Sequence, residues 1–280
     1  MSYPIFPPEI EEIIFVDALE PKSDGRGLLN LLLVAKRIHG WLLAKLFTTV
    51  AIRADKLTRR RYPFPWHINA LERYGVHTQH LFIWTSSEND KNDEDLQPVQ
   101  CLSFCPNVTN LVLWTDSDLN QAEVELMSHL PLTHLSINRR MGQLPGDAPV
   151  LTRLFSRMTH LEDLGGFTRS CDLEMFKYLT SLTHLAIPDT GNAGVAMLFG
   201  NIPTLQVLVF SIGGEAIGIA NWVSGATSLD VDDPRVVRVT FRHDSQVEEW
   251  LLDVQEGRGM WGLADEAVRK RKLRQVGWGT

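Results

Sequence analysis

Four histidines occupy equivalent sequence contexts and are the first candidates for chemistry. His80, His134, His160 and His184 each come directly before a leucine. Imidazole binds metals and transfers protons near neutral pH, so grouped histidines suggest a metal site or an acid–base site. A zinc site, however, needs three or four ligands that converge on one ion, and residues repeated along an array need not converge. The alternative is that histidine is only the residue that each repeat inherits, and we predict no metal and no cofactor.

Two tryptophans share the same kind of equivalence. Trp84 follows His80 by four residues, and Trp114 follows Asn110 by four residues. Exposed tryptophan and histidine on one surface are typical of binding anchors. The alternative is that the acidic segment 88–95 or a terminal helix covers the tryptophan pair, which then belongs to the core.

Motifs of catalysis are missing from the sequence. It contains no glycine-rich phosphate loop, no Gly-x-Ser-x-Gly and no His-Glu-x-x-His. The aspartates Asp189, Asp230, Asp232 and Asp233 stand in turn contexts, where aspartate bonds its own backbone. We therefore predict a binding protein that is not an enzyme.

Composition narrows the class of protein further. The chain has 280 residues, of which 44% are hydrophobic, enough for a sizeable core. Three cysteines are too few, and odd in number, for a disulfide framework, and Cys101 and Cys105 are expected to be buried small side chains. The net charge of −7 favours neither nucleic acid nor an anionic membrane as a partner. We expect a cytoplasmic protein, with the nucleus as a second option because of the basic run 269–274.

The candidate residues lie within an internal repeat. Leucines anchor it at steps of 30, 24, 26, 24 and 23 residues, namely Leu81, Leu111, Leu135, Leu161, Leu185 and Leu208. The form Leu-x-x-Leu-x-x-Leu-x-Leu resembles the leucine-rich repeat. This resemblance implies an α/β solenoid in which each Leu-x-Leu is a short strand, stacked in parallel on the next. Segments such as 121–129 and 193–199 have helical patterning and are expected to cover the outer side.

The repeat predicts which side chains face a ligand. In a strand x-Leu-x-Leu-x the leucines point inward, so the x positions share the concave face. The fourth repeat is anchored at Leu161, although Met158 and Leu164 also fit the pattern, and the degenerate last repeat places Arg238 and Thr240 on the same face. The predicted ligand or partner site comprises His80, Phe82, Trp84, Asn110, Trp114, His134, Asn138, His160 and His184.

The first fifty residues carry a second resemblance. Phe6-Pro7-Pro8-Glu9-Ile10 with Ile13, Leu32-Leu33-Val34-Ala35-Lys36-Arg37, Trp41 and Leu46-Phe47-x-x-Val50 resemble an F-box, with Phe6 in place of the usual leucine. That family is a helical bundle which docks onto the Skp adaptor of cullin-type ubiquitin ligases. The resemblance implies adaptor-binding residues Pro7, Pro8, Ile10, Leu32, Leu33 and Val34. The alternative is a helical cap that seals the end of the array, as stacked repeats require.

Three regions follow: an F-box-like helical segment (1–50), the repeat array (51–243) and a C-terminal helical cap (244–280) with Trp250, Leu251, Trp261 and Leu263 as buried anchors. The whole resembles fungal intracellular proteins that join an F-box-like start to leucine-rich repeats. We expect a substrate-binding adaptor of a cullin-type ubiquitin ligase. The alternative is a stand-alone module that binds a small molecule, pigment, sugar or peptide on its His/Trp-rich face. An adaptor site leaves apolar side chains of residues 8–34 exposed, whereas a cap buries them against Leu81 and Ile83.

Overall fold

The structure is a computed structural model, and it describes residues 7, 10–11, 13–14, 36–53, 68–85, 98–115, 118–138, 144–164, 173–188, 195–213, 233–241, 246–275 and 277. Strands and helices alternate along the chain. The strands are β1 (Thr49–Arg53), β2 (His80–Thr85), β3 (Asn110–Thr115), β4 (His134–Ile137), β5 (His160–Asp163), β6 (His184–Pro188), β7 (Val207–Gly213) and β8 (Val236–Phe241). The helices are α3 (Lys36–Thr48), α4 (Ile68–Tyr74), the 3₁₀ turn η1 (Gly75–His77), α5 (Pro98–Phe104), α6 (Gln121–His129), α7 (Ala148–Phe155), α8 (Leu173–Phe176), α9 (Val195–Asn201), α10 (Gln246–Glu256) and α11 (Met260–Gln275).

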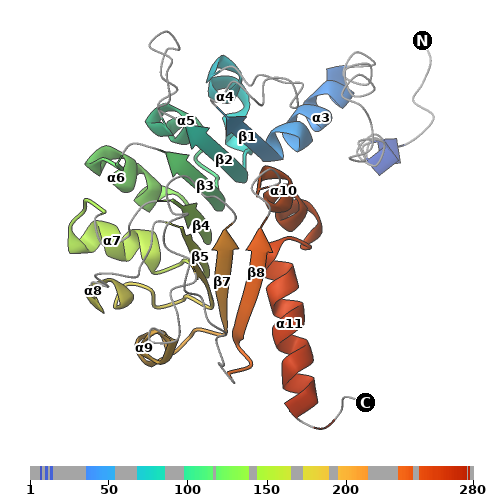
Figure 1. Cartoon of the computed structure of the whole chain (residues 1–280). Helices are drawn as coiled ribbons and strands as arrows, with labels where there is room; N and C mark the ends of the chain where they lie inside the picture. Colours follow the sequence, from blue (N-terminus) through green and yellow to red (C-terminus); the bar gives the residue numbers. More distant parts are fainter. Residues whose placement is uncertain are drawn as a thin grey trace.

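The eight strands form one parallel sheet whose order is the order of the chain. Each strand pairs with the next one, and the helices α4 to α9 follow one side of the sheet (Figure 1). This arrangement is α/β and consistent with a solenoid, as the repeat predicts. Within the described residues, no helix is both long and apolar enough to span a bilayer.

The leucine anchors form the main core. Strand pairing places them directly opposite one another, and Leu161 pairs with both Leu135 and Leu185, so the predicted anchor of the fourth repeat is confirmed. All six anchors are buried and belong to one apolar cluster with residues of the outer helices. We call this side of the sheet the leucine face. Burying one leucine side chain contributes about 1.5–3 kcal/mol, so the stack rather than any single repeat carries the stability.

Polar caps define where the outer helices begin. Asn120 and Glu123 form a reciprocal capping box at α6, in which the Glu123 N–H donates to Asn120 Oδ1 (3.0 Å) and the Asn120 N–H donates to Glu123 Oε2 (2.8 Å). At α7 the Val150 N–H donates to the Asp147 carboxylate (3.0 Å). Each cap satisfies an amide group that has no partner inside the helix.

Helix α3 seals the first end of the array. Leu42 and Phe47 are buried, and the Phe47 ring lies 4.9 Å from the ring of Tyr74. The chain then turns through Gly75, where a Cβ would collide with the Phe104 carbonyl oxygen. Any larger residue at position 75 would therefore push η1 away from α5.

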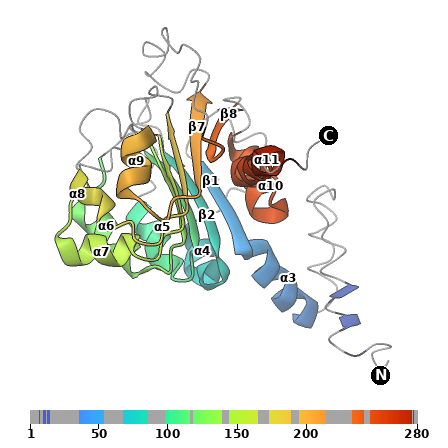
Figure 2. The same ribbon diagram turned by 90° about the horizontal axis from the view of Figure 1, so that it is seen from below.

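The C-terminal helices occupy the other side of the sheet. Seen from below, the sheet lies between α4–α9 and the α10–α11 pair (Figure 2). Met260, Ala264 and Val268 of α11 are buried against Val207 and Val209 of β7 and their neighbours.

At the other end of the pair, Val247 of α10 packs with Phe82, Trp84, Val112 and Trp114. The pair therefore does not simply close the end of the array: it crosses the face on which the sequence predicts a ligand site. Trp250, Leu251 and Trp261 are partly buried, as anchors should be, but Leu263 is 59% exposed, and its predicted burial is wrong.

The last repeat also departs from expectation. Arg238 pairs with Phe210, a leucine-face residue, whereas Val237 pairs with Val209 of the opposite face. Arg238 therefore points away from the predicted ligand face, and the register expected there is wrong by one residue. A slip of one residue exchanges the two faces of a strand, because side chains alternate.

Candidate functional site

The predicted site residues do form columns on one face of the sheet, which we call the strand face. Pairing places His80 opposite Asn110, Asn110 opposite His134, and the remaining histidines in turn opposite one another. Trp84 likewise pairs with Trp114. The repeat therefore predicts the alignment of these side chains correctly.

Their predicted exposure is wrong for four of the nine residues. Phe82 is fully buried, and Trp84, Trp114 and His184 are only 8–9% exposed. His80, Asn110, His134, Asn138 and His160 are partly exposed. Helices α10 and α11 cover the column, and the alternative in which a terminal helix makes the tryptophan pair part of a core is confirmed for this pair.

Trp250 of α10 holds the first part of the strand face. Its ring lies 5.4 Å from the ring of Phe82, and its indole N–H donates to Asn110 Oδ1 at 3.2 Å. Phe82 and Trp84 in turn meet Trp114 at 5.3 and 5.8 Å in edge-to-face geometry. Such ring pairs add about 0.5–1.5 kcal/mol beyond the area that they bury.

Three of the four histidines form a stack in the middle of the face. The ring centroids of His134 and His160 are 4.0 Å apart, as are those of His160 and His184, with interplanar angles of 14° and 10°. The edge of Trp261 from α11 closes the stack, 5.2 Å from His160 and 5.8 Å from His184. We refer to these three imidazoles as the histidine stack.

A ladder of threonines orients the stack. Each Thr that precedes a stacked histidine donates its hydroxyl proton to the carbonyl of the threonine one strand earlier: Thr133 to Thr109 at 3.2 Å, Thr159 to Thr133 at 3.1 Å and Thr183 to Thr159 at 3.1 Å. The same hydroxyl oxygens lie 2.9, 2.9 and 2.7 Å from the Nδ1 atoms of the following histidines. Each threonine side chain thus joins the backbone of the preceding strand to the imidazole that follows it. The Nε2 atom of His184 faces α11.

His184 has an acidic partner on α11. Its Nε2 atom lies 2.9 Å from Oδ1 of Asp265. This contact joins α11 to strand β6 of the sheet.

Burial keeps the rest of the stack neutral. Loss of solvent, together with the neighbouring imidazoles, lowers the pKa of His134 to about 4 and that of His160 to about 2. Burial also lowers the pKa of His80. The Nδ1 atom of His80 is buried and has no hydrogen-bond partner among the described residues. The reason is local: Gln79 replaces the threonine that precedes the other histidines.

The remaining polar residues of the strand face bond to one another. The Trp114 indole N–H donates to Ser136 Oγ at 3.0 Å, and the Ser136 hydroxyl donates to Glu162 Oε2 at 2.5 Å. Asn138 Oδ1 accepts from the Thr115 N–H at 3.0 Å. Asn138, expected to contact a ligand, thus supports the end of β3.

The geometry limits the chemistry that the stack can do. Nearly parallel rings direct their lone pairs side by side rather than toward one ion, and the described residues contain no group of three or more His, Cys, Asp or Glu suited to a metal. Thr183, His184 and Asp265 line up like a nucleophilic triad, but the hydroxyl proton of Thr183 is already directed at the Thr159 carbonyl. The same threonine–histidine pair recurs in two other strands, where no described acidic residue is bonded to the histidine, so its common role is to align the sheet.

Several contributors were missed from the sequence. The threonine ladder has a visible signal, because Thr-His-Leu occurs three times. Asp265 has no such signal in the sequence. It lies 81 residues from His184, and the residues around it do not distinguish it from a solvent-exposed aspartate on a helix.

The cysteines behave as predicted where they are described. Cys101 and Cys105 are buried and free. Burial raises the pKa of the Cys101 thiol to about 12 and that of Cys105 to about 11, so neither is a ready nucleophile or metal ligand. Cys171 lies outside the described residues.

The predicted adaptor-binding residues are described only in part. Pro7 and Ile10 are exposed, as are Ile13 and Ile14. Pro8, Leu32, Leu33 and Val34 lie outside the described residues. Comparison with known proteins adds no assignment, since no protein-family model and no curated protein match this chain.

Proposed function

We propose that the chain is a non-catalytic recognition protein, a substrate-binding adaptor of a cullin-type ubiquitin ligase, whose F-box-like start binds a Skp-type adaptor. The observation that carries this proposal is the exposure of three isoleucines. Ile10, Ile13 and Ile14 are 43, 56 and 47% exposed on helical residues. Positions i, i+3 and i+4 share one side of a helix, so the three side chains form a small apolar surface suited to a partner.

The backbone at this point has the expected beginning of a helix. The Pro7 carbonyl accepts hydrogen bonds from the N–H groups of Ile10 (3.0 Å) and Glu11 (3.1 Å). Proline is well tolerated at a helix start, because its missing donor would be unpaired there in any case. This is the first element of the F-box resemblance, and it presents Ile10 outward.

The rival interpretation, a cap, is less well supported. A cap would bury these isoleucines against Leu81 and Ile83. Those two residues instead share a cluster with Phe47 of α3 and Leu71 of α4. Helix α3, itself part of the 1–50 segment, covers this end of the array, whereas the three isoleucines stay exposed.

The contacts made by side chains of the strand face favour recognition over catalysis. Its histidines, threonines and tryptophans are engaged with one another and with α10 and α11. A stand-alone module that binds a small molecule, pigment, sugar or peptide on this face is favoured less, because its ligand would first have to displace both helices.

Binding of the full chain to a purified Skp-type adaptor, measured by isothermal titration calorimetry, tests the proposal. The double variant Ile10→Asp/Ile13→Asp replaces exposed side chains, so the fold should persist while binding weakens by at least about 30-fold, typical of losing an apolar anchor pair. The matched control is Val76→Asp, which alters another exposed apolar residue, on η1. It should bind like the wild type.

Two results would contradict the proposal. One is the absence of binding by the folded wild-type chain, and the other is unchanged affinity in the isoleucine variant. Either would return residues 1–50 to a purely structural role.

A further inference from the structure

The outward side of α11 combines positive charge with exposed leucines. Val268 is the last buried residue of the helix, and residues 269–275 are all exposed. Five of these seven carry a positive charge, namely Arg269, Lys270, Arg271, Lys272 and Arg274. Leu263 and Leu273 are also exposed, at 59 and 45%.

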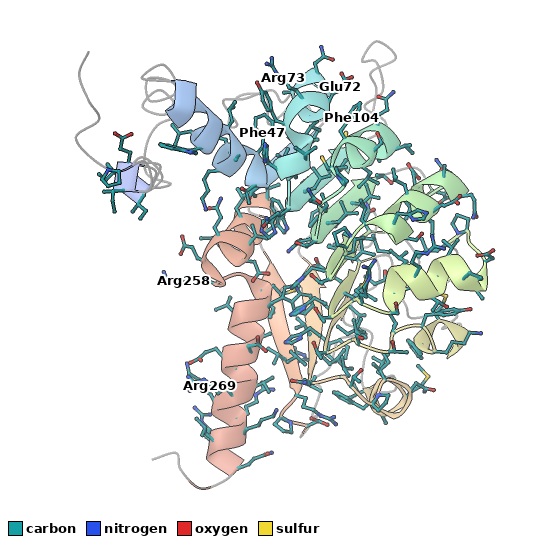
Figure 3. The ribbon with its side chains drawn as sticks, turned by 180° about the vertical axis from the view of Figure 1, so that it is seen from behind. Phe47, Glu72, Arg73, Phe104, Arg258 and Arg269 are labelled. Atoms are coloured by element: carbon teal, nitrogen blue, oxygen red, sulfur yellow. The ribbon has the colours of Figure 1, made fainter. Side chains whose placement is uncertain are left out.

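These side chains fall on one side of the helix. Leu263, Lys270 and Arg274 are spaced i, i+7 and i+11, so they follow a single line along the helix, and Leu273 and Arg269 lie beside it. The buried residues Met260, Ala264 and Val268 form the opposite side. Figure 3 shows Arg269 on the side of α11 that is turned away from the sheet. We define the outer α11 face as Leu263, Arg269, Lys270, Leu273 and Arg274.

Intramolecular pairing uses only part of this charge. Glu266 bonds both Arg269 (2.7 Å) and Lys270 (3.1 Å), and the Arg271 guanidinium donates to the carbonyl of Val236 at the edge strand. Arg274 forms no ion pair with a described residue. The outer α11 face therefore keeps a net positive charge in a chain that is acidic overall.

We propose that the outer α11 face binds an acidic amphipathic segment of a partner protein. In the context of the proposed function, on which this identification rests, that segment belongs to the protein recruited to the ligase. In a repeat array the strand face would be the natural place for recognition. Here α10 and α11 cover it, so the outer side of α11 takes its place.

Charge balance favours a protein segment over larger anions. The chain carries 27 Lys and Arg against 34 Asp and Glu, a net charge of −7. The run 269–275 contributes +5, so the remainder carries −12. Nucleic acid or an anionic bilayer extends beyond one helix and would be repelled by that remainder. A short acidic helix contacts only the outer α11 face, and its apolar residues can cover Leu263 and Leu273, which a phosphate backbone cannot do.

Fluorescence anisotropy with the full chain tests this inference directly. The probe is a fluorescein-labelled peptide of about 18 residues, with glutamates on one side and leucines at i, i+3, i+4 and i+7 of a helix. Wild-type protein should bind it, and binding should weaken as salt rises from about 0.02 to 0.15 M because exposed charges are screened. Lys270→Glu/Arg274→Glu should lower affinity at least about tenfold, and Leu263→Ser/Leu273→Ser several-fold at either salt concentration.

Matched controls distinguish binding at the outer α11 face from non-specific attraction of the peptide to any positive charge of the protein. Lys45→Glu reverses an exposed cation on α3 and should leave the affinity unchanged. The altered residues are exposed, so the circular dichroism spectrum and the urea midpoint of every variant should match those of the wild type. The assay contains no Skp-type adaptor, and it therefore reports on the outer α11 face even if adaptor binding through Ile10 and Ile13 fails.

Three outcomes would overturn the inference: no binding of the peptide by wild type, equal binding by Lys270→Glu/Arg274→Glu, or tighter binding of a DNA duplex or of phosphatidylserine vesicles than of the peptide. The last result would mean that the ligand of the outer α11 face is a polyanion and not a protein segment.

Discussion

The two sides of the sheet are built on different principles. The leucine face is apolar along most of the array, with the buried Asp163 as an exception, and each strand is covered by helices that lie next to it in the chain. The strand face has apolar clusters only at its two ends, with the histidine stack, Ser136 and Glu162 between them. Its cover comes from the far end of the sequence: Trp250 lies 140 residues from its partner Asn110.

The core of the leucine face is therefore formed by contacts between neighbouring repeats. The core of the strand face is formed by contacts between residues far apart in the sequence. On the leucine face each repeat, packed on its neighbours, contributes a similar amount to the free energy of unfolding. Loss of one leucine side chain should therefore lower that free energy by the full cost of the cavity it leaves. On the strand face, polar groups are buried, and buried polar groups must be paired. The threonine ladder and Asp265 supply much of that pairing, and α10 and α11 cover the face.

The largest expected effect comes from the leucine face. Leu161→Ala removes a fully buried side chain. We expect a loss of about 2–5 kcal/mol in the free energy of unfolding, the usual cost of such a cavity, measured by urea titration with circular dichroism. Leu263→Ala, an exposed leucine in the same protein, should stay within about 0.5 kcal/mol of wild type. Equal losses in the two variants would mean that the leucine face is not the main core.

A smaller effect is expected under α11. Trp261→Ala removes the ring that closes the histidine stack, but this ring is only partly buried. The expected loss is about 1–3 kcal/mol, and the amides of residues 260–275 should exchange hydrogen faster than those of β2 to β6. Acceleration of equal size in the strands would show that both faces unfold as one unit, and would remove the distinction drawn above.

The smallest and most specific effect is a pH dependence. Burial lowers the pKa of His134 to about 4 and of His160 to about 2, below the ordinary value of 6.5. A histidine with a lowered pKa binds its proton more readily in the unfolded chain. Stability is therefore complete above pH 6.5 and falls as the pH decreases toward the folded-state pKa, by up to about 1.4 kcal/mol per pH unit for each histidine.

Urea midpoints at pH 7.5, 6.5 and 5.5 measure this dependence. His160→Phe removes one titrating group, so its midpoint should change less between pH 6.5 and 5.5 than that of the wild type. A slope identical to that of the wild type would mean that the histidine stack does not set the acid sensitivity.

Particular residues show how far prediction from sequence reaches. The alignment of His134, His160 and His184 follows from a repeated Thr-His-Leu and from the leucine anchors, and it is correct. Arg238 was placed on the wrong face, because a degenerate repeat has no leucine to set its register. Of the residues predicted to bind the adaptor, Pro7 and Ile10 are exposed as required, and Pro8, Leu32, Leu33 and Val34 lie outside the described residues.

The sequence by itself determined the order of the strands and, for the repeats anchored by a leucine, the side of each strand on which a residue lies. It could do so because leucine spacing and strand alternation are local patterns that every repeat restates. Only the tertiary structure decided which of these residues meet solvent. Exposure depends on whether another segment of the chain packs on a surface. Helices α10 and α11 come from the far end of the chain, and their sequences contain no periodic pattern that indicates where they pack. Trp84 and Trp114 are therefore correctly aligned by sequence and buried by packing.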